Sequence, residues 1–389
     1  MTRMKKTILR LSIVLVALCL LFFFLLPILL DKFSNRVVGP AVHQPSPRAI
    51  ALHKELLIAD LHADGLLWNR NLLERNSRGH VDLPRLIDGN IALQAFTVVT
   101  KMPPVFDYKG NTGSIDLITP LAVVQGWPIK CWRSLKERAL FQAEKMQLLA
   151  AQSSGKFVVI KSANDLSAYL ERRKQENDLT AGFLGIEGAH ALDGDLANLD
   201  VLYDAGFRMI APTHFFDNEI GGSAHGVNNG GLTEMGKELI RWMEAKKMIV
   251  DLAHASTKVI EDAVALSTRP VVISHTGVRG TCDNNRNVSD AIIRLVAGTG
   301  GVIGIGFWET ATCGGDAKAA ARSIRYVTKL VGVEHVGLGS DFDGAVAQPF
   351  DAAGLIQITD ALLADGFNEE EIKKIMGENV LRLLLENLP

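Results

Sequence analysis

Eight short apolar segments, separated by stretches of helical periodicity, constrain the fold of this 389-residue chain more than any other feature. Most of them are rich in β-branched residues and do not alternate with polar residues, as is typical of strands buried on both faces of a parallel sheet. The predicted strands are residues 56–61, 92–99, 182–186, 208–212, 248–252, 270–274, 301–306 and 335–339. The predicted helices between and after them include 232–246, 256–266, 289–297, 317–330 and 369–385. This alternation predicts an α/β fold of the (β/α)8 TIM-barrel type.

Two further segments do not fit the repeat. A ninth apolar run, residues 157–160, leaves the number of strands open, and it fits an accessory strand beside the predicted helix 135–152. Residues 101–132 have little periodicity, two turns that contain proline and several aromatic residues. We interpret this segment as an insertion near the mouth of the barrel.

The N-terminus carries an apolar run, residues 11–30, without a charged residue, and about 20 such residues cross a bilayer as a helix. The run follows the basic residues Arg3, Lys5, Lys6 and Arg10. The positive-inside rule therefore places the short tail in the cytoplasm and the rest of the chain on the other side of the membrane, in the periplasm or outside the cell. The run is longer than the apolar part of a cleaved signal peptide and ends without a small-residue cleavage site, which favours an uncleaved anchor over cleavage.

These features predict three parts of the chain. We expect a cytoplasmic tail and transmembrane signal anchor over residues 1–34, a proline-rich linker over 35–50 and the barrel over 51–389. The charges of the chain nearly cancel, with 41 basic against 43 acidic residues. Binding to nucleic acid requires a basic stripe, so we expect the lipid bilayer and no nucleic acid among the partners.

Polar side chains follow six of the predicted strands at the point where each strand ends: His62, Asp64, Glu187, His214, His254, His275 and Asp341. The carboxyl ends of the strands of an α/β barrel lie on one face, where the active site is found. Each residue alone is more often an ordinary loop residue, but the whole set is hard to explain in that way. Imidazoles and carboxylates that converge on one rim favour a site for a divalent ion, and zinc fits them best.

Other polar residues remain ambiguous by pattern alone. Asp343 lies in the same turn as Asp341, and we favour a structural role for it. Arg286 precedes a predicted helix and is, by position, slightly more typical of a surface residue. His190 and His225 lie away from the strand ends, and we expect them to be structural.

The segments DLHAD, GIEGAH, PTH, DLAHAS, SHTG, DNNRNVSD and GLGSDFDG, in this order, resemble the membrane (renal) dipeptidase family, a branch of the metal-dependent amidohydrolases. The resemblance extends from about Ala59 to the C-terminus. It implies a barrel that holds two zinc ions per subunit, one bound by His62 and Asp64 and the other by His254 and His275. Glu187 would bridge both ions.

The resemblance also implies the remaining roles. His214 would polarise the substrate carbonyl, Arg286 would bind the substrate carboxylate, and Asp341 would act as acid and base. A hydroxide bridging the zinc ions would then hydrolyse the peptide bond of a dipeptide. Other possible functions are hydrolysis of N-acyl amino acids or lactones by a related amidohydrolase, and binding without catalysis by a membrane-anchored protein.

The family also bears on the covalent and quaternary structure. Animal members carry a disulfide near the position of Arg286, which implies a Cys282–Cys313 bond and a free Cys131. Homodimers are common in the family, so a homodimer is possible here. Animal members are tethered by a C-terminal lipid anchor, whereas we expect this chain to be tethered by its N-terminal run.

Overall fold

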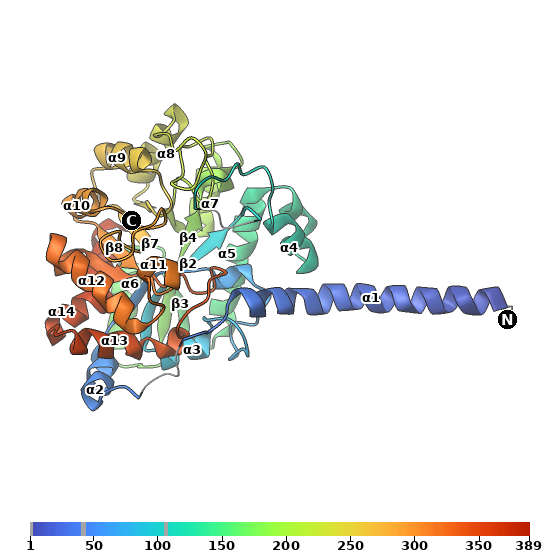
Figure 1. Ribbon diagram of the computed structural model, residues 1–389, viewed down its shortest axis with the longest axis horizontal. Helices are drawn as coiled ribbons and strands as arrows, with labels where there is room; N and C mark the ends of the chain where they lie inside the picture. Colours follow the sequence, from blue (N-terminus) through green and yellow to red (C-terminus); the bar gives the residue numbers. More distant parts are fainter. Residues whose placement is uncertain (1–2, 40–43, 105–107) are drawn as a thin grey trace.

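The body of the molecule is built around a curled parallel sheet, in a computed structural model that describes residues 3–39, 44–104 and 108–389 (Figure 1). Its strands are β1 (Ile58–Ala63), β2 (Ile91–Val99), β4 (Thr180–Glu187), β5 (Phe207–Ile210), β6 (Ile249–Val250), β7 (Val272–Thr276), β8 (Val302–Ile305) and β9 (Val336–Leu338). They pair in the order β6-β5-β4-β2-β1-β9-β8-β7, and an isolated parallel bridge between Asp251 and Val272 links the two ends of this order. Each predicted strand is present, which confirms the TIM-like α/β fold.

The ninth apolar run forms a short accessory strand, β3 (Phe157–Val159), after helix α5 (Leu135–Gln152). It pairs in parallel with the first residues of β4, with Phe157 opposite Thr180. The later half of β4 pairs with β5 instead. This arrangement leaves the eight-strand order unchanged.

Helices cover most of the outside of the sheet. Besides α5, the helices of the body are α2 (Pro47–Glu55), α3 (Leu83–Asp88), α4 (Ile118–Val124), α6 (Ala163–Arg173), α7 (Asn198–Ala205), α8 (Glu234–Ala245), α9 (Thr257–Leu266), α10 (Asp290–Gly298), α11 (Glu309–Thr312), α12 (Ala317–Val331), α13 (Ile356–Ala364), α14 (Glu369–Lys373) and α15 (Asn379–Asn387). Their N-caps follow ordinary chemistry: the Ser256 side chain, for example, accepts a hydrogen bond from the Val259 amide at the start of α9. Helix α2 starts at Pro47, inside the range predicted as linker.

The predicted helix 369–385 is divided in the structure. A π-helical turn, Lys374–Glu378, separates α14 from α15. At Gly377 the backbone passes so close to the Leu57 carbonyl that a Cβ would lie 1.8 Å from its oxygen. The close approach requires glycine and redirects the chain, so that α15 runs beneath the sheet.

The apolar core closes one end of the barrel. Every residue of β2 and β4 is buried, and each buried large aliphatic side chain contributes about 1.5–3 kcal/mol to folding. Leu381 and Leu384 of α15 pack in one cluster with Ala59 and Leu61 at the start of the barrel. The carboxyl ends of the strands are therefore the end available for a site.

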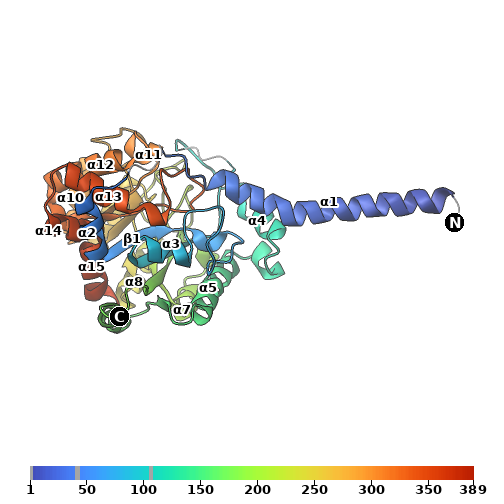
Figure 2. The same ribbon diagram turned by 90° about the horizontal axis from the view of Figure 1, so that it is seen from below.

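The N-terminal helix α1 (Arg3–Ser34) projects from the body as a single long rod (Figure 2). Most of its large apolar side chains are exposed. Among the described residues it is the one helix long and apolar enough to cross a membrane by length and composition. Its last turns contact the body, where Pro27 and Asp31 are buried, together with Asn35 directly after the helix.

Candidate metal centre and active site

The structure brings the eight sequence-predicted site residues together at the carboxyl ends of the strands. Asp64, Glu187, His214, His254, His275, Arg286 and Asp341 line one pocket. His62 is fully buried directly behind them, with its Nε2 atom 3.6 Å from both Asp64 Oδ1 and Glu187 Oε1. Residues from six strands therefore meet at one place, as the barrel topology requires.

Glu187 lies at the centre of this group. Its Oε1 atom is 3.0 Å from His254 Nε2, 3.4 Å from His275 Nε2 and 3.6 Å from His62 Nε2. Its Oε2 atom is 3.1 Å from His214 Nε2. Ligand atoms at about 2.1 Å from a tetrahedral zinc ion are about 3.4 Å apart. The observed spacings match the edges of such a coordination shell.

Hydrogen bonding around the imidazoles leaves their Nε2 atoms free for a cation. Ser274 Oγ is 3.0 Å from Nδ1 of both His62 and His275, so it can accept a bond from each Nδ1–H group. His62 Nε2 is buried without a hydrogen-bond partner, and the Nε2 atoms of His254 and His275 face each other at 3.0 Å. Buried polar atoms are normally satisfied, and a bound cation would satisfy these.

Three overlapping groups offer ligand atoms within 4.8 Å of one another: His62–Glu187–His275, Glu187–His214–His254 and His62–Asp64–Asp341. Glu187 belongs to two of them and His62 to two. The three groups therefore form one continuous cluster of candidate ligands. The side chain of Asp64 is fixed by Thr97, whose hydroxyl donates to Asp64 Oδ1 at 2.6 Å.

The electrostatics of the cluster also favour cations. Burial raises the pKa of Glu187 well above its ordinary value and raises that of Asp341 to about 7, and the nearby charge of Asp64 adds to both shifts. Burial lowers the pKa of His62, but the charges of Glu187 and Asp64 outweigh it and raise the pKa to about 10. Burial holds the pKa of His254 well below its ordinary value, so this imidazole is neutral. The excess of buried carboxylates is the condition that divalent ions relieve.

Arg286 occupies the same pocket. Its guanidinium lies over the Trp308 ring, with Cζ 5.2 Å from the ring centroid, and donates to the His275 carbonyl at 3.1 Å. The loop that carries Arg286 is joined to the residue after α11 by a Cys282–Cys313 disulfide, as expected. Cys131 is free and buried. The placement of Arg286 differs from the surface position that its sequence context alone favours.

Several residues of the site lack a strong sequence signal. Met102 and Tyr108, from the predicted insertion 101–132, line the pocket, which confirms its position at the mouth. Ser274 and Thr97 orient ligands from inside strands. The one clue for Ser274 is that it directly precedes His275. His190 and His225 lie outside the ligand groups, and burial lowers the pKa of each to about 3.

The turn after β9 holds Asp341 in an unusual backbone conformation. Asp341, Asp343 and Ala345 have φ values of 57°, 64° and 57°, in the left-handed region. His254 has a φ of 60°. Such conformations cost about 1–3 kcal/mol each for residues other than glycine and concentrate at functional sites, where the surrounding structure holds them.

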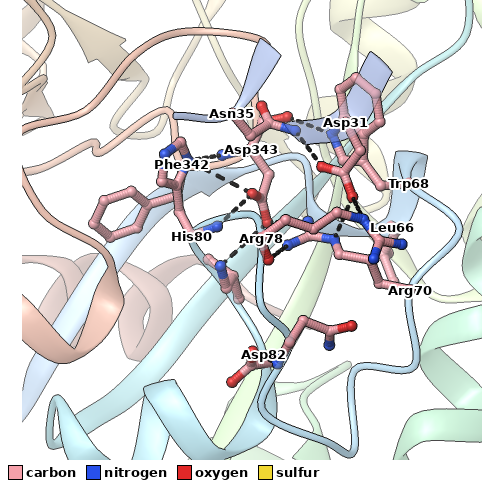
Figure 3. Close-up of polar contacts among 12 residues, drawn as sticks. Asp31, Asn35, Leu66, Trp68, Arg70, Arg78, His80, Asp82, Phe342 and Asp343 are labelled. Atoms are coloured by element: carbon pink, nitrogen blue, oxygen red, sulfur yellow. Dashed lines mark hydrogen bonds and ion pairs between the residues drawn. The ribbon is translucent and has the colours of Figure 1, made fainter. Parts of the chain in front are cut away.

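Asp343, two residues after Asp341, is held by a different set of contacts (Figure 3). Its carboxylate pairs with Arg70 and accepts hydrogen bonds from the backbone amides of His80 at 2.6 Å and Val81 at 3.2 Å. The Trp68 indole donates to its carbonyl at 2.7 Å. These contacts support the structural role predicted for Asp343.

The same contacts extend to the end of α1. Arg70 Nε lies 3.3 Å from Asp31 Oδ2, and Arg78 Nε donates to that oxygen at 2.8 Å. Asn35 Oδ1 accepts from the Ala345 amide at 3.0 Å. We call the residues Asp31, Asn35, Arg70, Arg78 and Asp343 the anchor latch, because they fix α1 to the turn that carries Asp341.

Comparison with known proteins places this geometry in a family. The family model described as membrane dipeptidase (peptidase family M19) matches residues 46–387. An uncharacterised dipeptidase of Schizosaccharomyces pombe is 29% identical over 324 residues, which cover 80% of this chain and 73% of that protein.

Solved structures share the fold. The probable dipeptidase PvdM of Pseudomonas aeruginosa superimposes with a TM-score of 0.72 at 21% identity, over 88% of this chain and 99% of that one. A metallopeptidase of Rhodobacter sphaeroides, bound to a phosphinate mimic of the dipeptide L-Ala-D-Ala, superimposes with a TM-score of 0.65 at 23% identity, over 86% and 99% of the two chains. With its fold, its convergent ligand groups and the family match over most of its length, the chain belongs to the membrane dipeptidase family of metallopeptidases, peptidase family M19.

Proposed function

We propose that this protein is a dipeptidase that binds two zinc ions bridged by Glu187 and hydrolyses the peptide bond of dipeptides. The observation that carries the proposal is the convergence of three imidazole Nε2 atoms on Glu187 Oε1, at 3.0–3.6 Å. In this assignment His62 and Asp64 hold one ion, and His254 and His275 hold the other. Bound zinc would supply Lewis-acid chemistry, lowering the pKa of a coordinated water and polarising the peptide carbonyl.

The protein's own groups would perform the remaining tasks. Burial raises the pKa of Asp341 to about 7, which suits a carboxylate that takes a proton from water and returns it to the leaving amine. His214 lines the pocket, and burial lowers its pKa well below the ordinary value. A neutral imidazole can donate its N–H to the substrate carbonyl oxygen and stabilise the charge that develops there.

Arg286 would set the length of the substrate. Its planar guanidinium can bind a carboxylate with two parallel hydrogen bonds. Trp308 and the His275 carbonyl hold it in place, so the distance from the clamp to the ligand groups is fixed. The carboxylate bound there would be the C-terminal carboxylate of a dipeptide, with its peptide bond at the neighbouring ligand groups.

We also propose that α1 is an uncleaved anchor that leaves the barrel on the extracytoplasmic side. The side chain of Asp31 is only 1% exposed and meets two arginines of the body. Removal of α1 with this residue would deprive Arg70 and Arg78 of a shared, buried partner. The latch therefore supports retention of the helix in the mature protein.

The test uses the full chain in detergent, stripped of metal and reloaded with zinc. Substrates are L-Ala-L-Ala, L-Ala-D-Ala and N-acetyl-L-Ala, with Glu187→Gln as the variant. We expect two bound zinc ions per chain and zinc-dependent hydrolysis of dipeptides. The variant should lose at least about 100-fold in metal affinity or activity, because its amide cannot bridge two cations as an anion.

Each alternative has its own result in the same experiment. Hydrolysis of N-acetyl-L-Ala without hydrolysis of either dipeptide would identify a different amidohydrolase. Two bound zinc ions without turnover of these substrates would point to another amide substrate, whereas a chain that binds no zinc would favour a binding protein.

A further inference from the structure

An apolar groove separates α1 from the short helix α4. We call residues 114–129, which include α4, the α4 segment. The walls of the groove include Phe22, Leu26 and Leu30 of α1 and Leu117, Leu121 and Val124 of the α4 segment, and its volume is ≈ 330 Å³. The two helices are in contact and lie side by side in Figures 1 and 2, where α4 stands away from the rest of the body along the rod of α1. The groove is therefore framed on one side by the candidate membrane span itself.

The position of α4 along α1 determines how deep α4 would lie in a bilayer that α1 spans. The uncharged run 11–30 is about 30 Å long as a helix, which equals the hydrocarbon thickness of a bilayer of about 30 Å. The groove residues from Phe22 to Leu30 cover about 12 Å of this length at the end nearest the body. If α1 spans the bilayer, α4 must lie at the depth of the acyl chains of the outer leaflet.

The surface of the α4 segment suits that depth. Residues 117–129 contain no charged side chain. Ile129 is 71% exposed, the highest value among the large apolar side chains of the described residues, and Ile115 and Leu117 are 59% and 39% exposed. The adjacent acid, Asp116, is neutralised by Arg138, with Asp116 Oδ2 2.6 Å from Arg138 Nη1. Water is a poor solvent for such a surface, whereas lipid is a good one.

The anchor latch prevents α4 from leaving this position. Asp31 and Asn35 bind the body through buried contacts, so α1 and the barrel are joined directly and not through a free tether (Figure 3). The match to the family begins at residue 46, so both residues lie outside it. The relation between the span and α4 therefore depends on features of this chain outside the family match.

We propose that the α4 segment, residues 114–129, is a second membrane element that enters the outer leaflet beside α1, with lipid acyl chains filling the groove between them. This inference rests on the proposal that α1 is an uncleaved anchor. Leu67, Met102 and Ala345 line both the groove and the active-site pocket. These shared residues separate the pocket from the groove by a single layer of side chains, so the proposed acyl chains would lie next to the active site.

The test measures the depth of single fluorescent labels in vesicles. The full chain, with Cys19→Ala, is reconstituted in phosphatidylcholine vesicles that carry nitroxide-labelled acyl chains. A bimane label is attached to one introduced cysteine: Ile129→Cys in the α4 segment, Ile13→Cys within α1, or Leu385→Cys on α15. All three positions are exposed, α15 lies on the far side of the body from α1 in Figure 2, and Cys131 is buried.

We expect the lipid nitroxides to quench the label at Ile129 about as strongly as the label at Ile13, and several-fold more strongly than the label at Leu385. Strong quenching at Ile13 with quenching at Ile129 no greater than at Leu385 would overturn this inference alone, because water or a second copy of the chain would then cover the segment. Weak quenching at Ile13 would overturn the anchor and this inference together. The dipeptidase proposal is tested separately by turnover in detergent.

Discussion

The metal centre and the anchor latch are both buried clusters of charge, and they meet in the turn that carries Asp341 and Asp343. In the latch, the Asp343 carboxylate accepts two backbone amides and pairs with Arg70. In the metal centre, His62 Nε2 has no partner, and two imidazoles direct Nε2 atoms at each other. Both oxygens of the Asp343 carboxylate thus have donors within the protein, whereas the unsatisfied ligand atoms of the metal centre leave a place for a cation.

The largest effect that we predict is the loss of catalytic rate on substitution of Asp341, on the metal-centre side of the turn. Asp341→Asn keeps the shape of the side chain but removes its basicity, so we expect kcat for a dipeptide to fall by about 10²–10⁴-fold. Bound zinc, measured by elemental analysis, should remain at the wild-type level. Loss of one zinc per chain would instead make Asp341 a metal ligand, as its proximity to His62 and Asp64 allows.

The same substitution at Asp343, which belongs to the anchor latch, should lower the free energy of unfolding. Asp343→Asn removes one of the two carboxylates that face the buried Arg70 and leaves Asp31 as the other. Breaking a buried pair costs about 3–5 kcal/mol, so with Asp31 still in place we expect a loss of about 3 kcal/mol. Chemical denaturation of the full chain in detergent measures the free energy of unfolding. The control is Asp178→Asn, which removes an exposed ion pair to Lys156 and should leave stability unchanged. Equal effects of the two variants would contradict the structural role of the latch.

A smaller effect should follow from loss of one hydroxyl behind the ligands. Ser274→Ala removes the acceptor shared by His62 and His275, and such changes lower metal affinity by about 10–100-fold. Competition with a chelator measures the affinity. Ser167→Ala deletes an exposed helix hydroxyl and serves as the control. Because the ligands themselves remain, activity should recover at saturating zinc, and failure to recover would show that Ser274 does more than orient them.

The smallest predicted effect is a release of protons on zinc binding. In the metal-free protein the charges of Glu187 and Asp64 outweigh burial and raise the pKa of His62 to about 10, so this imidazole is protonated at neutral pH. Burial raises the pKa of Asp341 to about 7, so this carboxyl gains a proton as the pH falls through that value. Cations displace these protons, and zinc affinity should therefore rise between pH 6 and pH 8.

Calorimetry in buffers of different ionisation enthalpy counts the released protons, because the buffer that takes them up contributes its own heat. A binding enthalpy independent of the buffer would contradict the prediction. Ser167→Ala should release as many protons as the wild type.

The apolar runs in the sequence allow both the fold and the polar site residues at the strand ends to be predicted. Apolar runs without alternation define the strands locally, and the topology of a parallel barrel then collects the residue after each strand on one face. His62, Glu187 and His275 could be found in this way although they are far apart in the chain. Their roles came from the resemblance to a family rather than from the pattern, and the position of Arg286 shows how far the two can differ.

The parts that could not be predicted depend on contacts between distant segments. Asp31 and Arg70 are ordinary charged residues in sequence, and only the folded chain shows that both are buried against the turn at Asp343. The division of the last helix at Gly377 depends on the Leu57 carbonyl, more than three hundred residues earlier. Neither contact leaves a periodic signal in the sequence.

The hydrogen bond between Asn35 and the Ala345 amide also sets an order of assembly during synthesis, because it joins residues 310 positions apart. At ribosomal rates of about 5–20 residues per second, about 15–60 seconds separate the two halves of the contact. As the anchor proposed above, α1 would enter the bilayer first and remain there while the barrel is exported. Nascent chains that already contain Glu187, His254 and His275 still lack the turn with Asp341, so the proposed hydrolytic site is completed only when almost the whole chain has been synthesised.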